Sequence, residues 1–167
     1  MITRLFSTTN TVSALSVFKN SCYHKIDFKI HEEHSVRKAV QMFATFNIGC
    51  LAVTDAQQNV VGVLSERDYI NKIASLDKDP VSIQIKDICT YTPNIIIAKK
   101  NDTLEQCMNK MLIKDIRHLL VIDDANNDFI GMISIKDLIK EIMRDKDDII
   151  TRLTDFKKGK GGYFGSE

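Results

Sequence analysis

The sequence lacks the features that mark several common classes of protein. Its 23 basic and 22 acidic residues leave a net charge of +1, so it has no basic excess of the kind that nucleic-acid-binding domains show. No run approaches about 18 uninterrupted apolar residues, which excludes a membrane-spanning helix. The four cysteines form no C-x-x-C pair, and the four histidines do not stand at zinc-ligand spacing from them. The composition therefore predicts a packed globular protein without a metal site or a disulfide framework.

Acidic residues are also missing from the first 26 positions. This stretch, MITRLFSTTNTVSALSVFKNSCYHKI, contains Arg4, Lys19 and Lys25 and is rich in Ser and Thr. Such a composition is typical of a mitochondrial transit peptide. The alternative is a disordered N-terminal tail on a cytoplasmic protein. We therefore expect residues 1–24 to be a leader or a tail, and a mitochondrial location if they are a leader.

The sequence does contain an internal repeat. GVLSERDYI at 62–70 matches GMISIKDLI at 131–139, and IGCLAVTD at 48–55 matches IRHLLVID at 116–123. Few residues are identical, but the hydrophobic positions coincide along the whole unit. A repeated pattern of this length indicates one supersecondary unit that occurs twice.

Each unit predicts a β-α-β-β-α order. Apolar residues at i, i+3, i+4 and i+7 favour helices near 36–43 and 104–112, and the polar stretches DAQQN and DDANND are typical of hairpin turns. A second helix follows each Ser-x-x-Asp, and the later one is expected to extend past residue 152. The predicted strands are 26–30, 50–54 and 60–64 in the first unit and 95–98, 119–122 and 129–133 in the second.

A unit of about 60 residues buries too little surface to be stable alone. We therefore expect residues 25–80 and 81–145 to pack sheet against sheet by pseudo-twofold symmetry, with clefts between them. Residues 146–167 are expected to form a helical extension and a flexible Gly-rich tail. No Ser/His/Asp or Cys/His triad is legible, so the sequence does not predict an enzyme.

These motifs resemble the CBS domain, a repeat named after cystathionine beta-synthase. GVLSERDYI and GMISIKDLI resemble its strand-to-helix signature. IRHLLVIDD resembles its Arg-His-Leu-Pro-Val strand, with Leu120 in place of the proline. The resemblance covers about residues 25–145 and is greatest to stand-alone CBS-pair proteins, including organellar ones.

The resemblance implies an α/β (α+β) fold in which two β-α-β-β-α repeats form one CBS-pair, or Bateman, module. It also implies a regulatory homodimer whose clefts bind an adenosine-containing ligand such as AMP, ATP, NAD or S-adenosylmethionine. For the organellar relatives it implies a client protein, for example a redox protein of the thioredoxin type. The alternative function is an interaction module that binds no ligand.

Each Ser-x-x-Asp has two interpretations. Ser65 with Asp68, and Ser134 with Asp137, stand where a capping box would begin a helix. A helix N-terminus also attracts phosphate, and Arg67 in that first turn is unfavourable to the helix dipole unless it binds an anion.

We assign the candidate nucleotide site to residues from both repeats. Asp68 would bind the ribose hydroxyls, as the matching aspartate does in the family. Lys29 and Ile97 stand where the family often has a small residue or Thr, and Lys29 would block the first cleft or contact a phosphate. The full candidate set is Ser65, Arg67, Asp68, Ser134, Lys136, Asp137, Arg117 and His118 for ribose and phosphate, with Ile30, Val63, Ala98 and Met132 for adenine.

Overall fold

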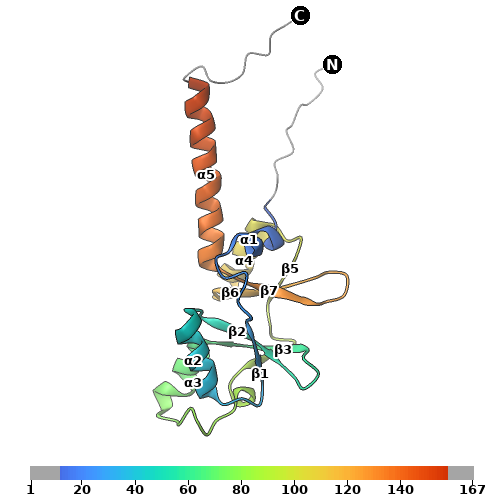
Figure 1. The fold of residues 1–167 in the computed structure, drawn as a ribbon, viewed down its shortest axis with the longest axis vertical. Helices are drawn as coiled ribbons and strands as arrows, with labels where there is room; N and C mark the ends of the chain where they lie inside the picture. The colour runs from blue at the N-terminus through green and yellow to red at the C-terminus, as the bar shows by residue number, and fades with distance from the viewer. Residues whose placement is uncertain (1–11, 158–167) are drawn as a thin grey trace, which may run out of the picture.

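The computed structural model describes residues 12–157 and contains two sheets that face each other (Figure 1). The first has the order β1 (Lys29–His31), β2 (Cys50–Thr54), β3 (Val60–Ser65) and β4 (Thr90–Tyr91). The second has the order β5 (Ile97–Lys99), β6 (His118–Ile122) and β7 (Phe129–Ser134). In both, a parallel pair is followed by an antiparallel hairpin. The predicted fold of two β-α-β-β-α units is therefore confirmed.

The helices lie on the outer faces of the two sheets. Ser35 precedes α2 and Thr103 precedes α4, and the Thr103 hydroxyl accepts a hydrogen bond from the Gln106 amide. Leu120 and Met132 of the second sheet pack into the hydrophobic core of the first, so the two units share a continuous interior. The helices are α1 (Ala14–Asn20), α2 (Val36–Phe46), α3 (Glu66–Lys72), α4 (Leu104–Ile113) and α5 (Ile135–Lys157), with short 3-10 turns η1 (Ala74–Leu76) and η2 (Ile85–Asp87).

The register of the two hairpins is the same. Cys50 pairs with Ser65 in the first sheet, as His118 pairs with Ser134 in the second. Each inner strand has its register shift at the same place, after Val53 and after Val121. Because side chains alternate between the faces of a strand, equivalent residues of the two repeats point toward the same interface.

The segment that precedes each repeat packs on the other repeat. The Ala14 amide at the start of α1 donates to the Asp102 carbonyl at 2.8 Å, and Val17 is buried in the second core. Ile85, at the start of η2, donates to the His34 carbonyl at 2.9 Å and is buried in the first core. The two connections are thus equivalent, and they cross between the halves.

The observed boundaries of the two repeats differ from the expected ones. Residues 81–91, which we expected in the second repeat, complete the first sheet and its core. Residues 14–20, expected in a leader or disordered tail, form a helix whose apolar face covers the second repeat. The rest of the predicted leader before residue 12, and the predicted tail at 158–167, lie outside the described residues.

Helix α5 continues well beyond the sheets, as the sequence predicted. Its first turns pack against α1, α4 and β7, where Leu138 and Glu141 are buried. Figure 1 shows the remainder of the helix extending away from both repeats. Within residues 12–157, no helix combines the length and the apolar character that crossing a membrane requires.

Candidate functional site: a cleft between the two repeats

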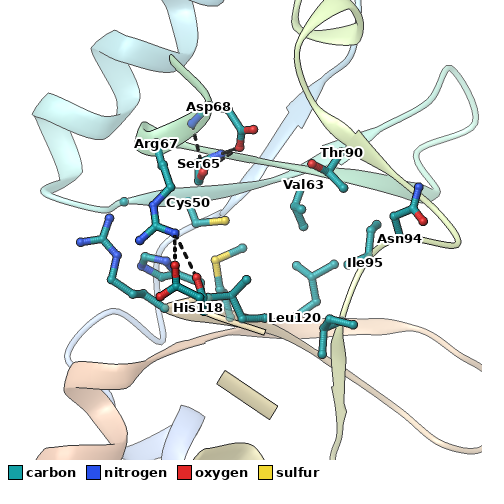
Figure 2. Close-up of a pocket in the computed structure, with 16 residues that line it drawn as sticks. Cys50, Val63, Ser65, Arg67, Asp68, Thr90, Asn94, Ile95, His118 and Leu120 are labelled. Carbon is teal, nitrogen blue, oxygen red and sulfur yellow. Dashed lines mark hydrogen bonds and ion pairs between the residues drawn. The ribbon is translucent and has the colours of Figure 1, made fainter. Parts of the chain in front are cut away.

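A cleft of about 240 Å³ opens between the two sheets (Figure 2). Strand alternation places Val63 and Ser65 of β3 on its wall, while Leu64 between them is buried in the first core. Residues of β6 and β7 form the opposite wall. The volume is slightly below the range of about 300–1,000 Å³ that is usual for pockets that bind small molecules.

Ser65 and Asp68 form the predicted capping box at the start of α3. The Asp68 amide donates to the Ser65 hydroxyl at 3.3 Å, and Asp68 Oδ2 accepts from the Ser65 amide at 2.9 Å. The same oxygen also accepts from the Ser65 hydroxyl at 2.6 Å. These bonds satisfy backbone donors that the first turn leaves without partners. The motif therefore forms the complete capping box that its sequence predicts.

The second carboxylate oxygen of Asp68 is also engaged. Lys72 Nζ lies 2.8 Å from Asp68 Oδ1 and donates to the Ile88 carbonyl as well. The Asp68 side chain nevertheless remains 18% exposed and lines the cleft. It is therefore held in a fixed orientation at the cleft wall, with its charge balanced by a lysine.

Arg67 extends from α3 toward the other repeat. Its Nη1 donates to the carbonyl and to the carboxylate of Asp115, both at 3.0 Å, in the loop between α4 and β6. Figure 2 shows the guanidinium at the same end of the cleft as His118. The anion that Arg67 binds is thus Asp115, whereas the sequence suggested that it would be a phosphate.

The backbone amides at the start of α3 offer less to an anion than we expected. The Glu66 amide donates to the Gly49 carbonyl at 3.1 Å, and the Asp68 amide donates to Ser65. In the second repeat the Ile135 amide donates to the Arg117 carbonyl at 2.9 Å. Most of each first turn is therefore already hydrogen-bonded, and any phosphate must be recognised mainly by side chains.

His118 is neutral at physiological pH. Burial and, to a smaller extent, the Arg117 charge lower the pKa of its imidazole to about 4, with Asp137 opposing this shift. The ring lies close to Gly49, where an added Cβ would come within 3.0 Å of His118 Cε1. Arg117 itself is exposed at the cleft mouth. His118 therefore contributes hydrogen-bonding capacity, and Arg117 contributes positive charge.

Cys50 lines both clefts, and its thiol is unreactive. Burial raises the pKa of its thiol to about 12, with Asp68 as the second cause. A thiol with this pKa carries almost no thiolate at neutral pH. Cys50 therefore acts as a small apolar wall residue in both clefts.

The far end of the first cleft is apolar. Figure 2 shows Val63, Ile95 and Leu120 around the same space, with Asn94 and Thr90 at its edge. Met132, equivalent to Val63 in the other repeat, closes the floor. The cleft is therefore apolar at one end and charged at the other, where Arg67 and Arg117 lie with Asp115.

Two of the predicted adenine contacts are not in either cleft. Ile30 pairs with Val53, and Ala98 pairs with Val121, so all four face the helices, and Ile30 and Ala98 are buried there. The alternation of the strand instead turns Lys29 and Ile97 toward the interface. They line an adjoining cavity between the hairpin tips, where Lys29 Nζ lies 5.6 Å from the Phe129 ring centroid. Lys29 therefore does not block the first cleft.

A second cleft of about 250 Å³ contains the equivalent Ser134 and Asp137. They repeat the capping box, with the Ser134 amide 2.8 Å from Asp137 Oδ2. The remaining oxygen, Asp137 Oδ1, accepts from the Ser21 hydroxyl at 2.9 Å, and Asp137 is only 6% exposed. Lys136 is exposed at the rim. The N-terminal segment thus covers the carboxylate in this repeat, whereas the Asp68 carboxylate, bound by Lys72, stays partly exposed.

Several cleft residues were not among the sequence candidates. Asp115 lies in a loop with no motif, and its proximity to Arg67 depends on how the repeats pack. Thr90 lies in β4, and Asn94 and Ile95 belong to the connection between β4 and β5. Residues that precede β5 correspond to residues that precede β1 in the first repeat. Extending the repeat in that direction would therefore have pointed to this part of the cleft.

Comparisons with known proteins agree with this architecture. The family model for the CBS domain matches residues 25–75 and 85–144. The CBS domain-containing protein CBSX3, mitochondrial, of Arabidopsis thaliana is 30% identical over 133 residues, which cover 78% of this chain and 63% of that protein. This chain thus spans less than two thirds of that relative's length.

Solved structures of CBS-domain proteins have the same fold. A protein with CBS domains from Burkholderia ambifaria superposes with a TM-score of 0.72 at 25% identity, covering 80% of this chain and 95% of that one. A CBS domain protein from Pyrobaculum aerophilum, complexed with AMP, superposes with a TM-score of 0.58 at 25% identity, covering 65% and 80%. The chain therefore belongs to the CBS domain family, and its two repeats form a CBS pair.

Proposed function

We propose that this chain is a regulatory CBS pair whose first cleft binds an adenosine nucleotide of the AMP, ATP or NAD type. The observation that carries the proposal is the division of that cleft, which is apolar near Val63 and Ile95 and carries two arginines, Arg67 and Arg117, at the other end. Adenosine nucleotides have a matching division, with an apolar base at one end and phosphate at the other. Asp68 stands between the two ends.

The base would bind between the two sheets. Val63 and Thr90 are on one wall and Leu120 and Met132 on the other, so a flat ring contacts both repeats at once. Pockets for small molecules are mostly apolar, with a few polar groups that fix orientation. The exposed side chain of Asn94 at the edge is suited to that polar role.

The ribose would bind to Asp68. Its Oδ2 holds Ser65, but Oδ1 is bound only by the ammonium of Lys72, whose side chain is 43% exposed. Two ribose hydroxyls can donate to this carboxylate while Lys72 keeps its bond to the Ile88 carbonyl. The fixed orientation of the carboxylate reduces the entropy that is lost on binding.

The phosphate would bind to Arg67. The side chain of Arg67 is 49% exposed and that of its partner Asp115 is 91% exposed, so their ion pair is weak. A phosphate accepts two parallel N–H bonds from an arginine and can therefore replace Asp115 at low cost. This exchange would release the contact between α3 and the other repeat.

Two further observations support the proposal. The Pyrobaculum aerophilum protein, which shares the fold, is complexed with AMP. In the second cleft the Asp137 carboxylate is less available to a ribose, because its Oδ1 already accepts a hydrogen bond from the Ser21 hydroxyl. We therefore assign binding to the first cleft, with Ser65, Arg67, Asp68, Arg117, Val63 and Met132 as its residues.

The regulatory role follows from the position of the cleft. A ligand that contacts both repeats stabilises one arrangement of them, and it changes the affinity for a client protein only by its differential binding to the two arrangements. We propose a non-enzymatic role, a homodimer and a mitochondrial location, in line with the Arabidopsis relative. A redox protein of the thioredoxin type remains the proposed client.

The second candidate function is an interaction module that binds no nucleotide. It is favoured by one observation, namely that both Ser-x-x-Asp motifs are complete capping boxes without a ligand. A thermal-shift panel separates the two functions, because a ligand that binds only the native state raises the melting temperature. AMP, ATP and NAD at millimolar concentration should raise it, and cytidine and uridine nucleotides should not. No shift with any adenosine compound would favour the interaction module.

A further inference from the structure

Helix α5 presents a continuous apolar stripe that no other part of residues 12–157 covers. The stripe runs from Ile139, near the start of the helix, to Leu153. Large side chains on this stripe are about half exposed or more, which is unusual for contiguous apolar residues. Its exposed members are Ile139 (48%), Met143 (59%), Ile149 (56%), Ile150 (61%) and Leu153 (60%).

The spacing of the stripe matches a coiled-coil seam. Residues 139, 142, 146, 149 and 153 are separated by alternating steps of three and four, and four of these five are Ile or Leu. Met143 and Ile150 widen the stripe on one side. This 3-4 alternation keeps a row of side chains facing a partner helix along the whole contact.

The outer half of α5 has no support from its own repeats. The helix packs against α1, α4 and β7, and its buried residues Leu138 and Glu141 lie in its first turns. Figure 1 shows the rest of the helix extending away from both repeats. An unsupported amphipathic helix gains most of its stability from packing its apolar face. The stripe therefore requires a partner surface of similar length.

We propose that the stripe pairs in antiparallel orientation with the same stripe of a second copy of this chain. Lys146 stands at the centre of the seam, and three aspartates, Asp145, Asp147 and Asp148, surround it in the sequence. A parallel pair in register would bring two Lys146 ammonium groups together. An antiparallel pair places Lys146 against Ile149 of the second copy and within reach of that copy's Asp145.

The stripe is complementary to itself in antiparallel orientation, which identifies a second copy of the chain as its partner. In the antiparallel register, position 139 lies opposite 156, 142 opposite 153 and 146 opposite 149. Met143 and Ile150 then flank each other on one side of the seam, so the wider part of the stripe is also covered. A second copy of the stripe thus covers the apolar residues and also provides an acidic partner for the central lysine. This surface is separate from the nucleotide cleft and does not depend on it.

Sedimentation analysis of the full chain tests the proposal. The wild type should be a dimer at about 10 µM, a concentration typical of such measurements, and Ile149→Asp should halve its mass. Thr151→Asp is the matched control, because it adds the same carboxylate two residues away on the opposite, exposed face of α5. The control should remain dimeric.

A second variant separates pairing from helix stability. Lys146→Leu removes the polar residue from the seam, and it should tighten the dimer about tenfold, because a polar seam residue reduces stability. A variant that only damaged α5 could not do this. In a Cys22→Ser background, Lys146→Cys with Ile149→Cys should give disulfide-linked dimers, and Lys146→Cys alone should not.

Four results would overturn the proposal. They are a monomeric wild type, a dimer that survives Ile149→Asp, equal disruption by Thr151→Asp, and cross-linking through Lys146→Cys alone. Recruitment of monomeric wild type to phosphatidylcholine vesicles, lost in Ile149→Asp, would assign the stripe to a membrane surface instead.

Discussion

Arg67 and Asp115 lie 48 positions apart, yet the Arg67 guanidinium contacts both the carboxylate and the carbonyl of Asp115 at 3.0 Å. This contact joins α3 of the first repeat to the α4–β6 loop of the second. It also occupies the arginine that we assign to a phosphate. The ion pair is therefore both a bridge between the repeats and a competitor of the proposed ligand.

Removing that competitor should improve nucleotide binding. Asp115→Asn leaves the backbone carbonyl in place but removes the charge, so Arg67 is freed for the phosphate. We expect AMP to bind about threefold to tenfold more tightly, equivalent to roughly 1 kcal/mol, with the unfolding free energy changed by less than about 1 kcal/mol. Asp124→Asn, a charge loss in the exposed turn of the second hairpin, is the control. Unchanged or weaker binding in Asp115→Asn would remove Arg67 from the site.

His118 should make the protein less stable in mild acid. Its folded pKa is about 4 against an ordinary value of 6.5, so between these values the unfolded chain binds a proton that the folded chain does not. Stability is therefore complete above about pH 6.5 and falls toward pH 4, by up to roughly 3 kcal/mol.

Urea unfolding at pH 7 and pH 4.5 measures this effect. His118→Gln should reduce the loss of unfolding free energy between the two pH values, because glutamine does not titrate there. His34→Gln, at an exposed histidine, should leave most of the loss in place. An identical pH dependence in His118→Gln and wild type would contradict a lowered pKa of His118 in the folded protein.

The N-terminal helix should be part of the folded unit. Val17 is 1% exposed in the second core, so Val17→Ala should lower the unfolding free energy by about 1–2 kcal/mol. Val81→Ala makes the same change at a side chain that is 52% exposed and should cost less than about 0.5 kcal/mol. Equal effects of the two substitutions would show that α1 is not docked in solution.

Ser21 extends the same test to the second cleft. Its hydroxyl donates to the buried carboxylate of Asp137, and Ser21→Ala leaves that oxygen without this donor. We expect a loss of about 1 kcal/mol in the unfolding free energy. Ser75→Ala removes an exposed hydrogen bond from the η1 hydroxyl to the Asn71 carbonyl of α3 and should have little effect.

The repeat determined how much of the fold was predictable. The strand 50–54 was placed at its observed bounds, because an apolar run between turn residues has a simple local signal. The capping boxes at Ser65 and Ser134 were predictable for the same reason. Residues 14–20 were misassigned because a Ser- and Thr-rich stretch without acidic residues has the composition of a leader even when it forms a helix.

The site was less predictable, because it is built from both repeats. Ile30 and Ala98 face the helices, because successive residues of a strand point to opposite faces of the sheet, and neither they nor their neighbours Lys29 and Ile97 line the two clefts. Asp115 reaches Arg67 only through packing of the two halves. The cover that Ser21 places over Asp137 depends on a segment that crosses to the other repeat, and no local pattern signals such a crossing.

Calorimetric titration of AMP into three forms of the full chain tests the central claim most directly. Wild type and Asp137→Ala should each bind one AMP per chain, and Asp68→Ala should bind none while its far-ultraviolet circular dichroism stays native. If wild type produces no binding heat with AMP, ATP or NAD, or if Asp68→Ala binds AMP as tightly as wild type does, the first cleft is not the nucleotide site.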